Sequence, residues 1–172
     1  MNIREADIND APGIARVVVD TWKSAYRGII SDDYLNNLSY QEREKGWREF
    51  PWDNSFVFVA EDDGKNVIGF VAGGPERESR SECQGEVYAI YVYQSHQYQG
   101  IGSLLFRALL RKLEQTGIHS LLVWVLTDSP FRRFYERQGG QAADSKLLEM
   151  EGFTNDITAY GWSDIRKVLN LL

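Results

Sequence analysis

A glycine-rich turn, Gln97–Ser103, joins a strand pattern to a helix pattern and constrains the fold more than any other feature of the chain. The residues before it, Glu86–Val92, are rich in β-branched and aromatic side chains, as buried strands are. The residues after it, 101–115, place apolar side chains at helical spacing. The first N–H groups of such a helix lack intrahelical acceptors and lie at the positive end of its dipole. The turn is therefore a candidate phosphate or pyrophosphate site, and the alternative is an ordinary tight connection.

Two common phosphate-binding motifs do not fit this turn. A Walker loop needs a lysine directly after its last glycine, but Gly102 is followed by Ser103, and no lysine arrives before Lys112. A dinucleotide fingerprint needs a third glycine where Leu105 stands, and it opens a parallel sheet, whereas a hairpin pattern precedes this strand. The pattern that remains is Gln/Arg-x-x-Gly-x-Gly/Ala, which is matched by Gln97, Tyr98, Gln99, Gly100, Ile101 and Gly102.

The rest of the chain alternates between helix and strand patterns without a linker or an internal repeat. Helices are predicted at 8–22, in a broken region over 32–50 with Ser31 and Ser39 at helix starts, at 101–115, from Pro130 to about 139, and in a tail that buries Ile165, Val168, Leu169 and Leu172. Strands are predicted at 2–6, 56–60, 67–74, 86–93, 119–126, 142–150 and 154–162. We therefore predict one domain over residues 1–172, a mixed α/β or α+β fold with a single sheet.

Composition narrows the class of protein. An apolar fraction of 43% and an aromatic fraction of 13% are typical of a globular chain. A formal net charge of −6 argues against a nucleic-acid partner, and it slightly favours a cationic small molecule. The longest apolar run, Leu121–Leu126, is too short to span a membrane, and no signal segment opens the chain. The single cysteine and two scattered histidines predict no metal site. Since neither a membrane span nor a signal segment is predicted, a reducing cytoplasm is the expected compartment.

Several passages in order resemble the GCN5-related N-acetyltransferase (GNAT) family, and the resemblance covers nearly the whole domain. Tyr91-Val92 followed by the turn matches the family's passage Tyr-Val-x-x-x-x-Gln-x-x-Gly-Ile-Gly. About thirty residues later, residues 134–139 match the family's Phe-Tyr-Glu-x-x-Gly. The opening Arg4-Glu5-Ala6 and the closing Tyr160-Gly161-Trp162 look like one bacterial branch of the family. The resemblance implies an acyl-CoA N-acyltransferase fold, with a mostly antiparallel, splayed sheet of about seven strands flanked by about four helices.

The resemblance also implies acetyl-CoA as the donor. The amides of Gln99–Ser103 would then hold its pyrophosphate, and the backbone of Ile90, Tyr91 and Val92 would pair with the pantetheine arm where the strand splays from its neighbour. Arg132 or Arg133 could reach a phosphate of CoA. Many relatives have an asparagine about six residues before the tyrosine, where this chain has Ser129. Its hydroxyl could replace that contact or could cap the following helix.

Two residues are the candidates for proton transfer. Tyr135 stands where the family has its general acid, which donates a proton to the departing thiolate; the alternative is a core tyrosine. Glu86 is the candidate base, acting directly or through water on the protonated amine, and by period two it shares a strand face with Tyr88 and Ile90. The alternative for Glu86 is an exposed carboxylate at the start of a strand.

The N-terminal helical region would line the acceptor pocket by analogy, with Trp22, Tyr26 and Tyr34 as candidate contacts; an aromatic core is the alternative. The predicted reaction is direct attack of a primary amine on acetyl-CoA, without a covalent acyl-enzyme and without a metal. Two other readings remain open: a non-catalytic acetyl-CoA-binding or sensing domain of the same fold, and a nucleotide-binding protein of another class. A homodimer through the last strands and the tail helix is a further expectation from the family.

Overall fold

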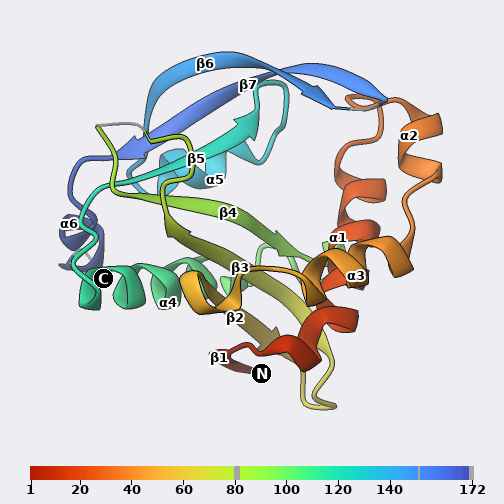
Figure 1. Cartoon of the computed structure of the whole chain (residues 1–172), viewed down its shortest axis with the longest axis horizontal. Helices are drawn as coiled ribbons and strands as arrows, with labels where there is room; N and C mark the ends of the chain where they lie inside the picture. Colours follow the sequence, from red (N-terminus) through yellow and green to blue (C-terminus); the bar gives the residue numbers. More distant parts are fainter. Residues whose placement is uncertain (80–81, 151, 171–172) are drawn as a thin grey trace.

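The computed structural model describes residues 1–79, 82–150 and 152–170 and shows one sheet with helices on both faces (Figure 1). Its seven strands lie in the order β1-β2-β3-β4-β5-β7-β6. They are β1 (Asn2–Glu5), β2 (Phe56–Glu61), β3 (Val67–Pro75), β4 (Gly85–Val92), β5 (Leu121–Leu126), β6 (Gln141–Met150) and β7 (Phe153–Trp162). All neighbouring strands are antiparallel except β4 and β5, so the predicted mixed fold with a mostly antiparallel sheet of seven strands is confirmed.

The described residues form six α-helices rather than the four or so that were predicted. They are α1 (Ala11–Ala25), α2 (Asp32–Asn36), α3 (Tyr40–Arg48), α4 (Ile101–Gln115), α5 (Arg132–Arg137) and α6 (Ile165–Asn170). The predicted broken region over 32–50 forms two separate helices, α2 and α3, each started by the serine predicted for it: Ser31 accepts a hydrogen bond from the Tyr34 amide, and Ser39 accepts one from the Glu42 amide. In α6, Ile165 and Val168 are buried as predicted, while Leu172 lies outside the described residues.

The first predicted helix begins later than its apolar spacing indicates. Residues Ile8–Asp10 form a 3-10 turn capped by Asp7, and α1 follows it. Ile8 is consequently 45% exposed instead of buried with the helix stripe. The Asp10 carboxylate receives two hydrogen bonds of 2.8 Å from Arg4 of β1, and Arg4 also pairs with Glu61 of β2. These ion pairs fix the start of α1 against the first two strands.

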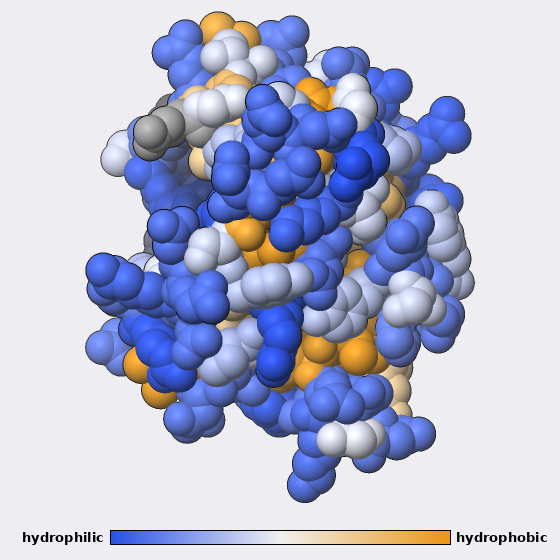
Figure 2. All heavy atoms as spheres, turned by 90° about the vertical axis from the view of Figure 1, so that its right-hand side faces the viewer, coloured by the Kyte–Doolittle hydropathy of each residue, from blue (hydrophilic) through white to orange (hydrophobic). Residues whose placement is uncertain are grey.

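Each face of the sheet buries its own apolar layer. Alternate residues of β2 show this directly, since Val57 and Val59 pack with Ile14 and Val17 of α1. On the other face, Ala60 of β2 packs with α4 and α6 in a cluster that contains Leu105, Leu109 and Ile165. The outer side of the α1–α3 layer is mostly hydrophilic with small apolar areas (Figure 2). One of the two edge strands of the sheet, β6, is mostly exposed. The expected homodimer stays a prediction.

The sheet opens between β4 and β5. These two strands pair at only three positions, Gly85–Val87 with Leu121–Val123. Beyond them, β4 continues beside β3, and β5 continues beside β7. A bulge accompanies the separation: Ala72 of β3 pairs with Ala89 and Gly73 pairs with Val87, so Tyr88 is an extra residue on β4. Since a bulge bends a strand and increases its twist, Tyr88 turns β4 away from β5. This opening positions the candidate site.

Candidate active site

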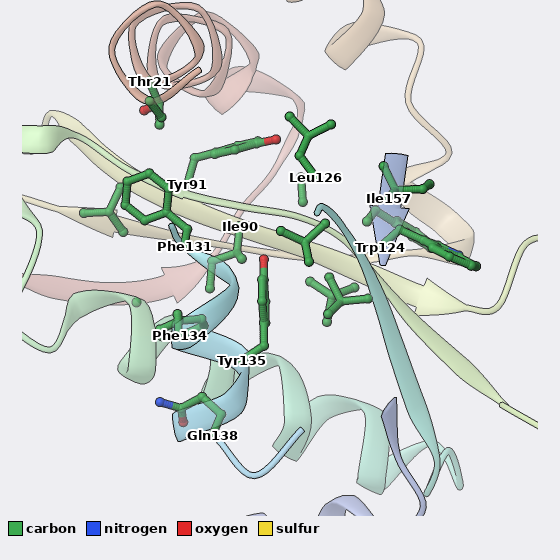
Figure 3. Close-up of a pocket in the computed structure, with 18 of the residues that line it drawn as sticks. Thr21, Ile90, Tyr91, Trp124, Leu126, Phe131, Phe134, Tyr135, Gln138 and Ile157 are labelled. Atoms are coloured by element: carbon green, nitrogen blue, oxygen red, sulfur yellow. The ribbon is translucent and has the colours of Figure 1, made fainter. Parts of the chain in front are cut away.

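A cavity of about 660 Å³ occupies the opening between β4 and β5 (Figure 3). Its walls are β4, β5, α5, the glycine turn, the end of α1, and parts of β6 and β7. Eight of the predicted cofactor-binding residues line it: Ile90, Tyr91, Val92, Gln97, Tyr98, Gly100, Gly102 and Ser103. The predicted catalytic residues, Tyr135 and Glu86, line the same cavity. The structure therefore brings most of the predicted site together in one place.

The glycine turn presents an uncapped helix end to this cavity. Gly100, the N-cap of α4, has a φ of +83° and offers no side chain to the first amides. In an α-helix the N–H groups of the first residues have no intrahelical acceptor, and here these are Ile101, Gly102 and Ser103. Tyr98, 90% exposed, also has a positive φ of 60°. The turn thus aims free amides at the space where an anion would bind.

Side chains of the turn hold it in place. The side-chain amide of Gln97 donates a 3.0 Å hydrogen bond to the backbone carbonyl of Val92, which connects the turn to the end of β4. The Gln99 amide donates a 3.2 Å bond to the carbonyl of Ser95. Gln99 and Ile101 are the two predicted cofactor contacts of the turn whose residues do not line the cavity; Ile101 is instead buried in the core. A role in anion binding is therefore left to the turn's backbone.

Tyr135 of α5 is buried, and its hydroxyl points into the cavity toward Ile90 (Figure 3). Its ring stacks on Tyr160, with 6.2 Å between centroids, and lies edge-on to Trp162. Burial raises the pKa of Tyr135 well above its usual value, and the nearby phenol of Tyr91 adds to the shift. The phenol is therefore protonated throughout the neutral pH range and available as a proton donor.

Glu86 is buried, with 4% of the residue exposed, and both carboxylate oxygens are engaged by Arg77. Arg77 Nη2 lies 2.6 Å from Oε1, and Arg77 Nε lies 3.0 Å from Oε2. The hydrogen bond to Glu86 is the main cause of a raised pKa at Arg77. Because Tyr88 is a bulge, strict alternation fails here, yet Glu86, Tyr88 and Ile90 all line the cavity. Glu86 is thus neither an exposed carboxylate nor a free one.

Besides Gln99 and Ile101, three predicted cofactor contacts outside the turn do not line the cavity. Ser129 is 1% exposed, and its Oγ accepts a 3.2 Å bond from the backbone amide of Phe131 in the turn before α5, whose N-cap is Phe131. Arg132 and Arg133 are exposed on the outer side of α5, where Arg132 bonds the Thr127 carbonyl. The cavity face of α5 carries Phe131, Phe134, Arg137 and Gln138 beside Tyr135. Helical spacing from Tyr135 could have identified Phe131, Phe134 and Gln138, which lie three or four residues from it or from each other.

The predicted acceptor contacts divide in the same way. Trp22 and Tyr26 line the cavity, and the Tyr26 hydroxyl lies 3.4 Å from that of Tyr91. Tyr34 does not line it: its ring packs edge-on against Phe153, with 4.9 Å between centroids. Other lining residues were not predicted from the sequence. They lie near the end of α1, in the loop after β3 and on β5, β6 and β7: Thr21, Arg77, Glu78, Trp124, Leu126, Lys146, Phe153 and Ile157. These contacts arise from strand pairing, which no local pattern reports.

Neither a metal site nor a membrane span is found in the parts that the structure describes. Within residues 1–79, 82–150 and 152–170, no three His, Cys, Asp or Glu side chains gather so as to hold a metal ion. Among the helices of those ranges, none is long and apolar enough to cross a membrane.

Comparisons with known proteins agree with this geometry. Residues 22–140 match the acetyltransferase (GNAT) family. The chain is 36% identical over 172 residues to the uncharacterised N-acetyltransferase YuaI of Bacillus subtilis (strain 168), covering 100% of this chain and 98% of that protein. It is 24% identical over 166 residues to phosphinothricin N-acetyltransferase of Streptomyces viridochromogenes, covering 96% and 84%.

The fold has also been seen in solved structures. PaiA N-acetyltransferase of Thermoplasma acidophilum, solved in complex with coenzyme A, superposes with a TM-score of 0.71 at 18% identity, covering 94% of this chain and 98% of that one. At this identity the likeness concerns the fold. The family match and the full-length relative establish membership: this chain belongs to the acetyltransferase (GNAT) family.

Proposed function

We propose that this protein transfers the acetyl group of acetyl-CoA to a primary amine by direct attack. The observation that carries the proposal is one continuous cavity, in a chain of this family, that extends from the uncapped N-terminus of α4 to the Tyr135 hydroxyl between two separated strands. A helix N-terminus suits the pyrophosphate of CoA. The thioester would lie farther along the opening, beside Tyr135.

The free side of β4 supports the placement of the pantetheine arm. After Val87, β4 has no strand partner on the side of β5 among the described residues, while its other side stays paired with β3 up to Val92. Backbone groups of Ile90, Tyr91 and Val92 therefore face an opening in which an extended amide-bearing chain could take the place of a strand. This arrangement would bring the thioester carbonyl to an N–H near Ile90, which would polarise it.

Tyr135 is proposed as the general acid. When the amine attacks, a thiolate departs and needs a proton, which the protonated phenol of Tyr135 would supply; its hydroxyl points into the cavity. The base has to remove a proton from an ammonium group, since a primary amine is charged at neutral pH. Glu86 already accepts two hydrogen bonds from Arg77. We therefore propose that Glu86 is the base and that it acts on the amine through water.

The acceptor is proposed to be a small molecule. Trp22, Tyr26 and Tyr91 give the cavity an aromatic wall beside the proposed thioester position. One relative is named for its action on phosphinothricin, which supports a small amine as the acceptor class. The cytoplasm is the proposed compartment, in line with a chain that carries a single cysteine.

The test is thiol release from acetyl-CoA in the presence of a mixed panel of amines. We expect release with one class of amine, and a loss of about a hundredfold or more in Tyr135→Phe. Tyr160→Phe is the matched control, because it removes a neighbouring phenol hydroxyl that bonds Glu136 and does not line the cavity. Tight acetyl-CoA binding without release for any amine would indicate a sensing domain instead, and no binding would overturn the proposal.

A further inference from the structure

We propose that the acceptor carries an acid group as well as its amine, and that Arg77 binds that acid group. This inference rests on the proposed acetyl transfer and adds the chemical class of the acceptor. It concerns four lining residues, which we call the charged cluster: Arg77, Glu78, Glu86 and Lys146. The cluster lies at the start of β4, whereas the glycine turn follows the end of that strand.

The guanidinium of Arg77 is held in a fixed position. Nε and Nη2 bond the two oxygens of Glu86, and the Arg77 amide bonds Oε2 at 3.3 Å. The guanidinium carbon also lies 4.1 Å from the centre of the Tyr88 ring, so the group is oriented by an ion pair and by a stacked aromatic side chain. Such fixation reduces the conformational entropy that a ligand contact would otherwise cost.

The same contacts leave part of the guanidinium available. In the part of the chain that the structure describes, the hydrogen bonds of the Arg77 side chain use Nε and Nη2, and the side chain is 57% exposed. Arginine has five N–H donors in one plane. The donors on Nη1 therefore remain for a planar or tetrahedral oxyanion, which arginine recognises with paired hydrogen bonds.

The charge balance of the cluster argues against a polycationic acceptor. Glu86 is paired with Arg77, and Glu78 is paired with Lys146, whose ammonium lies 4.2 Å from the centre of the Trp124 ring. The described members thus carry two positive and two negative charges, although the whole chain has a formal charge of −6. A polyamine would need carboxylates without cationic partners. The available donors of Arg77 instead call for a negative group on the ligand.

The position of Arg77 suits the acceptor and not a CoA phosphate. Val92 lies six positions after Glu86, which is about 20 Å along a strand, and the glycine turn lies beyond. By contrast, Tyr88, on which Arg77 stacks, precedes Ile90 by two residues, or about 7 Å. An acid group on Arg77 would therefore lie within the length of a small molecule from an amine at the thioester. In this arrangement Glu86, the proposed base, also holds Arg77 in position through its two hydrogen bonds.

The experiment compares acceptors that differ in one charged group. Thiol release is measured with glycine, β-alanine, γ-aminobutyrate, δ-aminovalerate, glutamate and leucine. It is also measured with the diamines and alkylamines of matching length and with glutamine and leucinamide. We expect at least one acid-bearing amine to exceed its matched diamine and alkylamine by about tenfold or more in kcat/KM. Equal or better turnover of the diamines or alkylamines would overturn the inference while leaving the proposed acetyl transfer intact.

Variants then connect the preference to Arg77. We expect Arg77→Gln to raise the KM of the acid-bearing acceptor by about tenfold to a hundredfold, with the KM of acetyl-CoA unchanged. Arg77→Lys should recover only part of the loss, since it keeps the charge without the paired donors. Arg48→Gln, which removes an arginine paired with Glu44 on the surface of α3, is the matched control. A uniform loss with every acceptor in Arg77→Gln would contradict the inference.

Folding of the variant is controlled separately. Arg77→Gln leaves the buried Glu86 without its cation, so its Kd for acetyl-CoA and its urea unfolding are measured beside those of Arg77→Lys, which keeps a cation next to Glu86. Both variants should fold and bind acetyl-CoA as the unchanged protein does; a preference for acid-bearing amines that survives in Arg77→Gln would contradict the inference. If acetyl-CoA binds and no amine releases thiol, the proposed function itself fails, and this inference fails with it.

Discussion

Gly102 of α4 lies directly against the ring of Phe134 of α5: a Cβ built on Gly102 would stand 3.3 Å from Phe134 Cε2. Phe134 immediately precedes Tyr135, so this contact sets the spacing between the glycine turn and the proposed general acid. A second link joins the same two segments: the side-chain amide of Gln138 donates a 3.0 Å hydrogen bond to Ser103 Oγ. The position of Tyr135 therefore depends on a close approach of α5 to the start of α4.

Gly102→Ala should move α5 and reduce acetyl transfer. The added methyl group would lie closer to the Phe134 ring than an ordinary van der Waals contact allows. It would push on that ring, which contacts the rings of Phe106 and Tyr135. We expect about a tenfold fall in kcat/KM for acetyl-CoA, with a loss of about 1 to 2 kcal/mol in unfolding free energy. Steady-state kinetics and urea unfolding measure the two effects.

Gly46→Ala is the matched control for this substitution. Gly46 lies inside α3, and a Cβ there meets nothing within 4 Å. The change should leave acetyl transfer unaltered and stabilise the protein by about 0.5 to 1 kcal/mol, because alanine loses less conformational entropy than glycine in a helix. Equal kinetic effects of the two substitutions would contradict the proposed coupling between α4 and α5.

The pH dependence of kcat should show no alkaline fall below about pH 10. Burial holds the pKa of Tyr135 above its usual value, so the phenol keeps its proton over this range. The rate should rise with pH as the acceptor amine loses its proton and then level off. Rate measurements from pH 6 to 10 check this, and a decline centred near pH 8 would exclude Tyr135 as the proton donor.

Arg137→Gln should weaken acetyl-CoA binding more than Arg133→Gln does. Arg137 lines the cavity, whereas Arg133 is exposed on the outer side of the same helix. We expect about a threefold to tenfold increase in Kd for acetyl-CoA with Arg137→Gln, as for the loss of one exposed ionic contact, and little change with Arg133→Gln. Isothermal titration calorimetry gives both values. A larger increase in Kd with Arg133→Gln than with Arg137→Gln would instead support the prediction that Arg133 reaches a phosphate of CoA.

Stability should fall in acid through Asp10. Burial opposes ionisation of this carboxyl group, but the hydrogen bonds from Arg4 and the Asp7 amide outweigh it and lower its pKa. A lowered pKa in the folded state stabilises the protein above the usual value of 3.8, and the gain is lost as the pH falls through the folded value. Asp10→Asn should cost about 1 to 3 kcal/mol at pH 7 and much less near pH 2. Urea unfolding at both pH values distinguishes this from a pH-independent loss.

The elements with strong periodicity could be predicted from the sequence. The helix at 101–115 was predicted with its observed bounds, and every predicted strand was found within a few residues of its place. Tyr135 and the glycine turn could be placed on one site because a sequence motif reports each of them. The first turn of the N-terminal helix was misplaced because Asp7 and Asp10 cap a 3-10 turn, which competes with the helical spacing of Ile8.

Contacts between distant segments could not be predicted in this way. Glu86 was expected on a regular strand face, but the bulge at Tyr88 and the ion pair with Arg77 depend on how β3 and β4 pair. Lys146 reaches Glu78 across 68 residues of sequence, and no local pattern relates the two. Ser129 was expected to contact the cofactor or to cap the following helix, but its hydroxyl bonds the Phe131 amide in the turn before α5, and the N-cap of α5 is Phe131.

The three-position pairing of β4 with β5 has a consequence for the lifetime of the protein. The two halves of the sheet are joined on that side only at Gly85–Val87, so the amides beyond this junction lack a ladder partner across the opening. A bound molecule that pairs with this part of β4 would complete the sheet and shield those amides from hydrogen exchange. By mass action, its concentration would then raise the resistance of the whole chain to unfolding and proteolysis. Supply of the donor would thereby set not only the rate of the enzyme but also how much of it persists.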